Sequence, residues 1–240
     1  MPIQTVEPQR LYRQIAEQLR QLMASGEFAV GSRLPAERDL AVQLGVSRPS
    51  VREALIALEV EGMIEVRTGS GIYVKNATAL KRPMASKAGD TPAEWGPLEV
   101  MSARILVESE VAALAAQNAQ KKDLKAMRDG LQQMKREAAR NEMPRQGDEA
   151  FHDAIAQACG NSVLLDTVQR FWVARNGPLF ERLGDYFEHP ASWQAAIAEH
   201  QAVLDAIEAG DASAARKAMQ KHLKHAHKRY SASWRRAPAR

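Results

Sequence analysis

Four side chains that can bind a metal ion occupy positions that a packed helical domain would bury. Asp148 and His152 are four residues apart, so both point from one face of a helix. His200 and His222 lie on the apolar stripes of two further helices. One carboxylate and three imidazoles suit a borderline divalent cation such as Zn²⁺ or Ni²⁺. The alternative is that each histidine only makes a hydrogen bond within the core.

The other ionisable residues of this half of the chain divide into exposed and buried sets. His225 and His227 share their helix faces with lysine, arginine and glutamine, so we expect both to be exposed. Arg104 instead lies on an apolar stripe, where a guanidinium needs a bidentate carboxylate. Glu108, four residues further on, could supply that carboxylate, and a bound ligand is the alternative.

The elements that position these residues are helices. From residue 97 onward the apolar residues recur at helical spacing nearly to the end of the chain, with no alternation of the kind that strands show. Short joints between the helices predict an antiparallel all-α bundle over residues 98–232. The candidate helices are 98–118, 121–139, 147–158, 162–182, 191–209 and 211–231. A segment rich in Ala, Lys, Pro and Gly, residues 79–97, is typical of an interdomain linker.

The N-terminal segment, residues 1–78, follows a different pattern. Residues 37–44 predict a short helix, and Gly45 suits the left-handed conformation that ends one. Ser47 can cap a second helix, in which Pro49 falls in the first turn and Gly62 ends the apolar stripe. Two helices joined by a three-residue turn form a helix-turn-helix, whose second helix enters the major groove of DNA.

A hairpin follows at once and makes the unit a winged helix. Residues 63–67 and 72–74 predict two short strands, with the glycine-rich turn 68–71 between them. Polar residues gather at the start of the second helix, where phosphates and base edges would lie. The candidate DNA-binding residues are Arg38, Ser47, Arg48, Ser50, Arg52, Thr68 and Gly69. The alternative for Arg38 and Arg52 is an ion pair with Glu37 or Glu53.

This segment resembles the GntR family of bacterial transcription regulators. The resemblance rests on Leu34-Pro35-Ala36-Glu37-Arg38, Gly45-Val46-Ser47-Arg48, Val51-Arg52-Glu53-Ala54-Leu55 and the Gly69-Ser70-Gly71 turn. It implies DNA contacts at the seven candidate residues. Pro49 stands where several relatives have a small polar residue, so no base contact is expected of it.

The helical half resembles the effector domain, called FCD, of the FadR-type branch of the same family. The matching motifs are Asp148-x-x-Phe151-His152, His200-x-x-x-Leu204 and Met219-x-x-His222-Leu223. The resemblance implies a metal held by Asp148, His152, His200 and His222. It also implies an organic-acid effector beside the metal, bound by Arg104. Asn161, at the start of a helix, and Arg175 are further candidates for the same pocket. Trp95-Gly96-Pro97 and Trp172-x-x-Arg175 look most like regulators of hexuronate catabolism, with lactate, glycolate and dicarboxylates as alternatives.

Composition limits the class of protein. The chain has 240 residues and a net charge of +4, but its last 25 residues hold 9 Lys/Arg and no acidic residue, so the basic excess lies outside the winged helix. Residues 233–240 form a basic tail. No apolar run is long enough for a membrane span, the N-terminus lacks the apolar core of a signal peptide, and the single Cys159 excludes an internal disulfide. These features predict a cytoplasmic protein without membrane association.

The sequence therefore predicts a ligand-responsive transcription regulator, and no enzyme. We expect a repressor that binds palindromic double-stranded operator DNA as a homodimer, because each winged helix contacts one half-site. A small organic acid would bind at the metal and bias the helices of the bundle. Two alternatives remain, a metal-dependent enzyme and a pure metal sensor, each carrying a DNA-binding domain.

Overall fold

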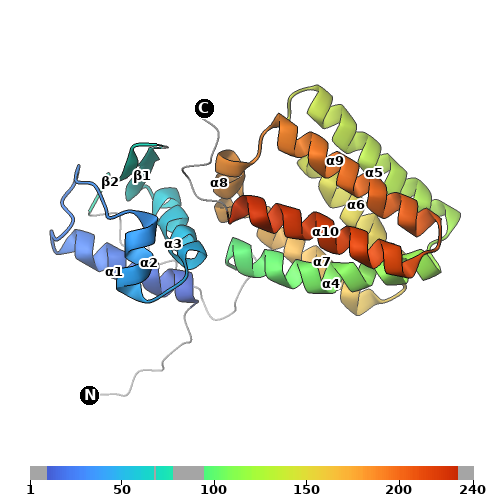
Figure 1. Ribbon diagram of the computed structural model, residues 1–240, viewed down its shortest axis with the longest axis horizontal. Coiled ribbons are helices and arrows are strands. Elements are labelled where there is room, and N and C mark those ends of the chain that lie inside the picture. Colours follow the sequence, from blue (N-terminus) through green and yellow to red (C-terminus); the bar gives the residue numbers. More distant parts are fainter. Residues whose placement is uncertain (1–9, 68, 78–94, 232–240) are drawn as a thin grey trace, which may run out of the picture. The chain divides into compact units, whose positions relative to one another are not determined.

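The computed structural model describes residues 10–67, 69–77 and 95–231. They form two compact units, one N-terminal and one C-terminal (Figure 1). Thr68, most of the predicted linker and the basic tail lie outside the described residues. Within the described ranges, no helix is both long and apolar enough to cross a bilayer.

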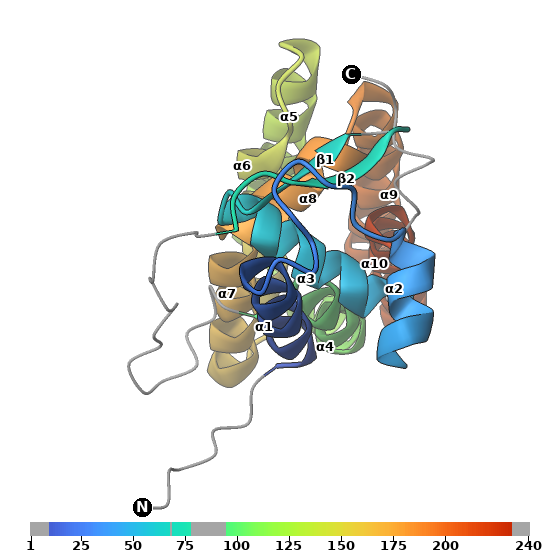
Figure 2. The same cartoon turned by 90° about the vertical axis from the view of Figure 1, so that its left-hand side faces the viewer.

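The N-terminal unit consists of three helices and a two-stranded antiparallel hairpin (Figure 2). Its elements are α1 (Leu11–Ala24), α2 (Glu37–Leu44), α3 (Arg48–Val60), β1 (Ile64–Arg67) and β2 (Gly71–Val74). Gly45 adopts the left-handed conformation at the end of α2, with φ +67°. Ser47 caps α3 by accepting a hydrogen bond from the Ser50 amide at 3.3 Å. The predicted helix-turn-helix and wing are therefore present.

The core of this unit lies where α1 and the hairpin pack against α3. Burial on α3 is wider than the predicted stripe, because α1 covers one side and β1 another, and it includes Ala54 and Ile56. Helix α1 is buried along one face. Tyr12 and Met23 are buried, whereas Leu11 is 48% exposed.

The C-terminal unit is an all-α bundle. Its helices are α4 (Pro97–Asn118), α5 (Lys121–Ala139), α6 (Arg145–Ala158), α7 (Ser162–Arg175), α8 (Pro178–Phe187), α9 (Pro190–Glu208) and α10 (Ala212–Tyr230). Helix α4 packs against α6, α7, α9 and α10, while α5 packs against α6 and α9. Cys159 is buried.

The prediction of a continuous helix over residues 162–182 is wrong. The helix ends at Arg175, and α8 begins at Pro178 after the Asn176-Gly177 joint. Proline has no amide to continue the hydrogen-bond ladder of α7, and it suits the first turn of a new helix. Apolar periodicity on both sides of the joint concealed the break.

Helices α5 and α6 meet through glycines. A Cβ atom at Gly147 would lie 2.3 Å from the backbone nitrogen of Met134, and one at Gly130 would lie 2.8 Å from that of Phe151. Only glycine permits so close an approach of two helix backbones. We call this contact the glycine crossing. It holds α6, which carries Asp148 and His152, directly against α5.

Candidate functional site

The bundle brings the four predicted metal ligands together in its interior. Asp148 and His152 come from α6, His200 from α9 and His222 from α10, and all four residues are buried. One ligand atom from each lies within 4.8 Å of the other three. The Nε2 atom of His200 is 3.0 Å from Asp148 Oδ1 and 3.2 Å from His152 Nε2. A single cation could therefore contact all four side chains.

Hydrogen bonds on the outer side of each imidazole show that these residues fit a cation. His200 Nδ1 donates to the carbonyl oxygen of Ala196 at 2.6 Å, and a carbonyl can only accept. His152 Nδ1 donates to Glu108 at 2.5 Å, and His222 Nδ1 donates to Glu199 at 2.9 Å. In the neutral rings the inward Nε2 atoms then carry lone pairs. Such outer acceptors are characteristic of metal-bound histidine.

The electrostatics of the cluster also favour a bound cation. Burial lowers the pKa of His152 and, further, that of His222, so both imidazoles stay neutral at neutral pH. Burial by itself raises the pKa of Asp148, but Arg175 and His200 hold the pKa of that carboxyl well below its usual range. The cluster thus presents one carboxylate together with the neutral imidazoles of His152 and His222, as cation binding requires.

Arg104 forms the ion pair that the sequence offered as the alternative to an effector contact. Its Nε donates to Glu108 at 2.5 Å and its Nη2 at 3.3 Å, with both side chains 2% exposed. The guanidinium also lies 4.9 Å from the centre of the Trp172 ring. Although burial opposes it, the charge of Arg104 and the hydrogen bond from His152 hold the pKa of Glu108 at about 2. Arg104 therefore supports His152 through Glu108.

Two contacts of the histidines escaped the sequence prediction. Glu108 was considered only as a partner for Arg104, although it also holds His152, and Glu199 holds both His222 and the exposed His225. No spacing along one helix reveals these contacts, because they join different helices. The one indication in the sequence was the position of Glu108, four residues after Arg104 and therefore on the inward face of α4.

The structure separates the two weaker effector candidates. Arg175 lines the cavity next to the histidines and donates to Asp148 Oδ2 at 2.9 Å and to the Tyr230 hydroxyl at 3.3 Å. Asn161 does not line it. Its side chain is exposed and caps α7 by accepting from the amides of Val163 and Leu164. In this structure Asn161 therefore has a capping role, and its expected effector contact stays a prediction.

A cavity of about 470 Å³, including space open to solvent, adjoins the cluster. Residues of α4, α6, α7, α9 and α10 line it, among them Arg104, Asp148, His200 and His222. The cavity brings charged groups and an apolar wall to one place, as small-molecule sites do.

On the N-terminal unit, most of the described DNA candidates lie on the surface. Ser47 and Arg48 are exposed at the start of α3, the Arg38 side chain is 79% exposed, and Ser50 is partly exposed. Gly69, at the tip of the wing, is exposed with φ +78°. These residues offer donors, a positive helix end and a closely approachable backbone to a nucleic acid.

Arg52 differs from this expectation. Its side chain is 2% exposed and binds Glu37 with two nitrogens, at 2.7 to 3.0 Å. The pair joins α3 to the start of α2. In this conformation the guanidinium fixes the angle between the two helices and does not face solvent, so a base contact would require it to leave Glu37.

A winged helix-turn-helix joined to a helical bundle with a buried polar centre defines a DNA-binding transcription regulator. Comparison with family models supports this class over most of the chain. Residues 11–74 match the model described as "Bacterial regulatory proteins, gntR family", and residues 99–225 match the FCD domain. The chain belongs to the gntR family and carries an FCD effector domain. It is a regulator and not an enzyme.

Characterised relatives share this organisation along their lengths. The Uxu operon transcriptional regulator of Escherichia coli (strain K12) is 37% identical over 92% of this chain and 87% of its own length. The Exu regulon transcriptional regulator of the same strain is 36% identical, over 92% and 84%. The Uxu operon regulator of Haemophilus influenzae is 35% identical, over 89% and 79%.

Proposed function

We propose that the protein is a repressor whose hold on operator DNA is controlled by an organic acid bound at a metal centre in the bundle. The observation that carries this proposal is the set of outer hydrogen bonds on His152, His200 and His222, which leave the three inner ring nitrogens to converge beside Asp148. A core histidine needs one partner, whereas here three rings converge as ligands do.

The ligand set favours Zn²⁺ or Ni²⁺. Imidazole nitrogens suit these borderline cations, and a single carboxylate is too few oxygens for Ca²⁺ or Mg²⁺. When bound, the cation would supply a positive centre for a carboxylate oxygen of the effector. The protein's own residues keep the ligands deprotonated and line the adjoining cavity.

A sugar acid is the effector that we infer. The motifs at Trp95 and at Trp172-x-x-Arg175 resemble those of hexuronate regulators, and relatives over 35% identical are named for the Uxu operon and the Exu regulon. Binding would draw α9 and α10 toward α6, because all three helices contribute to the cluster. The altered bundle would then change the presentation of the winged helices and release the operator.

A homodimer fits the exposed apolar surface of the bundle. Leu106 on α4 is 72% exposed, and Val163 and Val173 on the neighbouring α7 are also exposed. Burial of such a surface between two copies would pair two winged helices for a palindromic operator. Leu106→Glu should shift the protein from dimer to monomer in light scattering, and an unchanged dimer would place the interface elsewhere.

One titration tests the function. Operator binding is measured on metal-stripped protein, then with Zn²⁺ or Ni²⁺ alone, then with the metal and a panel of sugar acids and hydroxy acids. We expect the metal alone to preserve operator binding and the metal with an acid to weaken it. A response to metal alone would indicate a metal sensor and contradict the proposal.

A further inference from the structure

Residues of α9 and α10 line the cavity at two heights along the helix axes, which we call levels. The rings of His200 and His222 are 4.2 Å apart between centroids, so the two helices meet at that position, the metal level. Helix α10 turns back after Gly210 and packs along α9 (Figure 1). Seven residues back from His200 is Trp193, and seven residues on from His222 is Arg229. Both line the cavity and form what we call the distal level.

Two small residues lie between these levels. Ala196 and Ala226 occupy the intermediate turn of the two helices, and both line the cavity. Seven residues of helix rise by about 10 Å, so the metal level and the distal level are separated by the length of a small extended molecule. A three-carbon acid held at the metal level is too short to reach the distal level, whereas a six-carbon acid can span both.

Several buried hydrogen-bond donors in this part of the bundle have no acceptor. Among the described residues of the C-terminal unit, the buried side-chain atoms without a hydrogen-bond partner are all donors: Trp172 Nε1, Arg175 Nε, Trp193 Nε1 and Arg229 Nε. The last three belong to residues that line the cavity. Buried donors are normally paired, so a molecule rich in acceptor oxygens fits here.

Arg145 is set apart from the other arginines of the cavity. Three of the four face a carboxylate of the protein, in the pairs Arg104–Glu108, Arg175–Asp148 and Arg229–Glu188. Arg145 has no carboxylate partner among the described residues, and its side chain makes only a 3.8 Å contact with the Met143 sulfur. It begins α6 one turn before Asp148, where the positive end of the helix disfavours a second cation.

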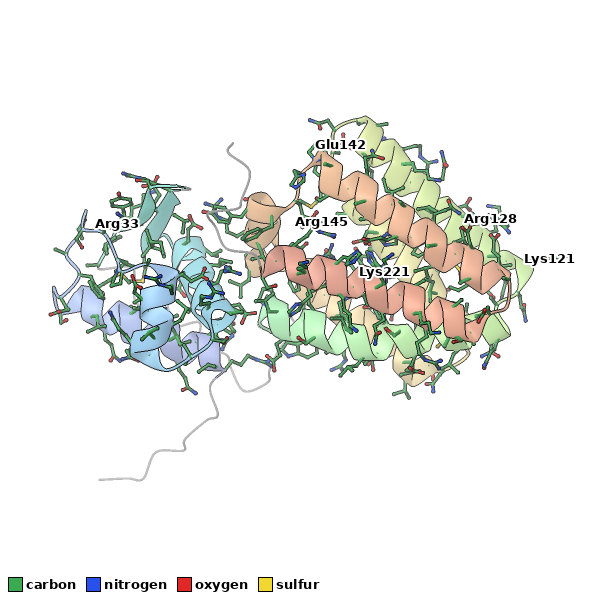
Figure 3. All side chains as sticks on the ribbon, viewed as in Figure 1. Arg33, Lys121, Arg128, Glu142, Arg145 and Lys221 are labelled. Atoms are coloured by element: carbon green, nitrogen blue, oxygen red, sulfur yellow. The ribbon has the colours of Figure 1, made fainter. Side chains whose placement is uncertain are left out.

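The position of Arg145 directs its charge at the cavity. Residues of α9 and α10 line the same cavity, and Figure 3 shows the Arg145 side chain in the space between these two helices. An unpaired guanidinium one helical turn from a metal ligand suits an incoming carboxylate, which can accept from it and contact the cation with its other oxygen.

The distal level has a different charge. Glu188 is 3.6 Å from Arg229 Nε and accepts a hydrogen bond from Ser192 Oγ at 2.8 Å. This carboxylate compensates Arg229 and would repel a second carboxylate on the ligand. A hydroxyl is favoured instead, since it can donate to Glu188 while it accepts from Trp193 Nε1.

We infer that Arg145, one turn from the metal level, binds the effector's carboxylate beside the cation while Trp193 and Arg229 bind hydroxyl or carbonyl oxygens at the distal level. The cavity thereby selects a six-carbon polyhydroxy acid with one carboxylate over short hydroxy acids and over dicarboxylates. This inference rests on the proposed function, because it takes the cavity beside the metal ligands as the effector site.

Calorimetric titration of the metal-loaded full-length protein tests the inference. The probes are D-glucuronate, D-galacturonate, D-fructuronate, D-tagaturonate, L-lactate and D-glucarate, and the metal content of each variant is measured first. We expect at least one of the four uronates to bind more tightly than L-lactate and D-glucarate. Arg145→Ala should weaken that uronate about tenfold or more at unchanged metal content, with partial rescue in Arg145→Lys.

The distal level is tested by Trp193→Phe, which keeps an aromatic side chain and removes the indole N–H. It should weaken the uronate about fivefold and leave L-lactate binding unchanged, since one hydrogen bond is lost. Arg170→Ala and Trp95→Phe are matched controls outside the cavity and should behave as the unmodified protein.

Two results separate the possible failures. If L-lactate binds as tightly as every uronate, and neither Arg145→Ala nor Trp193→Phe changes uronate binding, the inference is wrong while the proposed function stands. If no acid binds to the metal-loaded protein, the proposed function fails and the inference with it.

Discussion

Replacing Arg104 by methionine should destabilise the bundle strongly. The side chains of Arg104 and Glu108 are each 2% exposed, and methionine keeps an apolar stem without the guanidinium. Glu108 would retain only His152 as a partner. Loss of one partner of a buried ion pair costs about 3–5 kcal/mol, because an uncompensated charge stays in the core. For a unit of this size the melting temperature should fall by roughly 9–15 °C.

The loss should depend on pH in a definite direction. In the unmodified protein the pKa of Glu108 is about 2, below the ordinary 4.5, so its ionised form contributes stability above pH 4.5 that is lost as pH falls toward 2. Without Arg104 the same carboxyl loses its main counter-charge and should take up a proton more readily. The difference between the two proteins should therefore shrink as the pH is lowered from 7 to 5.

Thermal and urea unfolding followed by circular dichroism provide the measurement. Arg104→Met with Glu108→Gln should recover more than half of the loss, because the buried charge is removed and the amide oxygen can still accept from His152. Arg170→Met, on an exposed pair, is the control. A loss below about 1 kcal/mol would refute the reasoning. A large loss with a normal effector response in the folded variant would end the hypothesis that Arg104 clamps the effector.

Further predictions concern both units. Arg48→Ala should weaken specific operator binding by about 1–3 kcal/mol at fixed salt, measured by fluorescence anisotropy. An unchanged affinity would show that the assignment of α3 as the recognition helix is wrong. Arg52→Ala should lower the melting temperature of the N-terminal unit, since it leaves Glu37 without its partner. His200→Ala should abolish bound divalent metal in elemental analysis, whereas His225→Ala should retain it; equal metal in both would contradict the site. Metal-stripped protein should lose stability as the pH falls below 6.5, because burial keeps the pKa of folded His222 below that value while the unfolded chain takes up the proton; melting temperatures between pH 7.5 and 5.5 test this.

The sequence predicted elements well where local chemistry determines them. The bounds of α2 and α5 match the predicted ranges, because Gly45 ends one helix and Gln120 caps the other. The joint before Pro178 was not predicted, because apolar residues keep helical spacing on both sides of it and indicate one continuous helix. The inward spacing of the cluster indicated a candidate metal site, because helical geometry alone decides which face a residue occupies.

The spacing of residues along the sequence could not predict contacts between different helices. That Glu199 holds His222, or that Arg52 binds Glu37, depends on how two helices are rotated about their axes. Arg145 gave no signal at all, because an arginine at the start of a helix is common, and its lack of a partner is visible only in three dimensions.

The glycine crossing between α5 and α6 decides which parts of the bundle can respond to a ligand. At Gly147 and Gly130 backbone meets backbone, and no side chain is present to change rotamer and let one helix slide past the other. Helices α5 and α6 must therefore behave as one rigid unit, and Asp148 and His152 have fixed positions on it. Helices α9 and α10 meet the cluster through side chains and can shear. A bound acid would act by drawing these two helices toward a stationary α6, so α9 and α10 are the part of the bundle that would carry the signal.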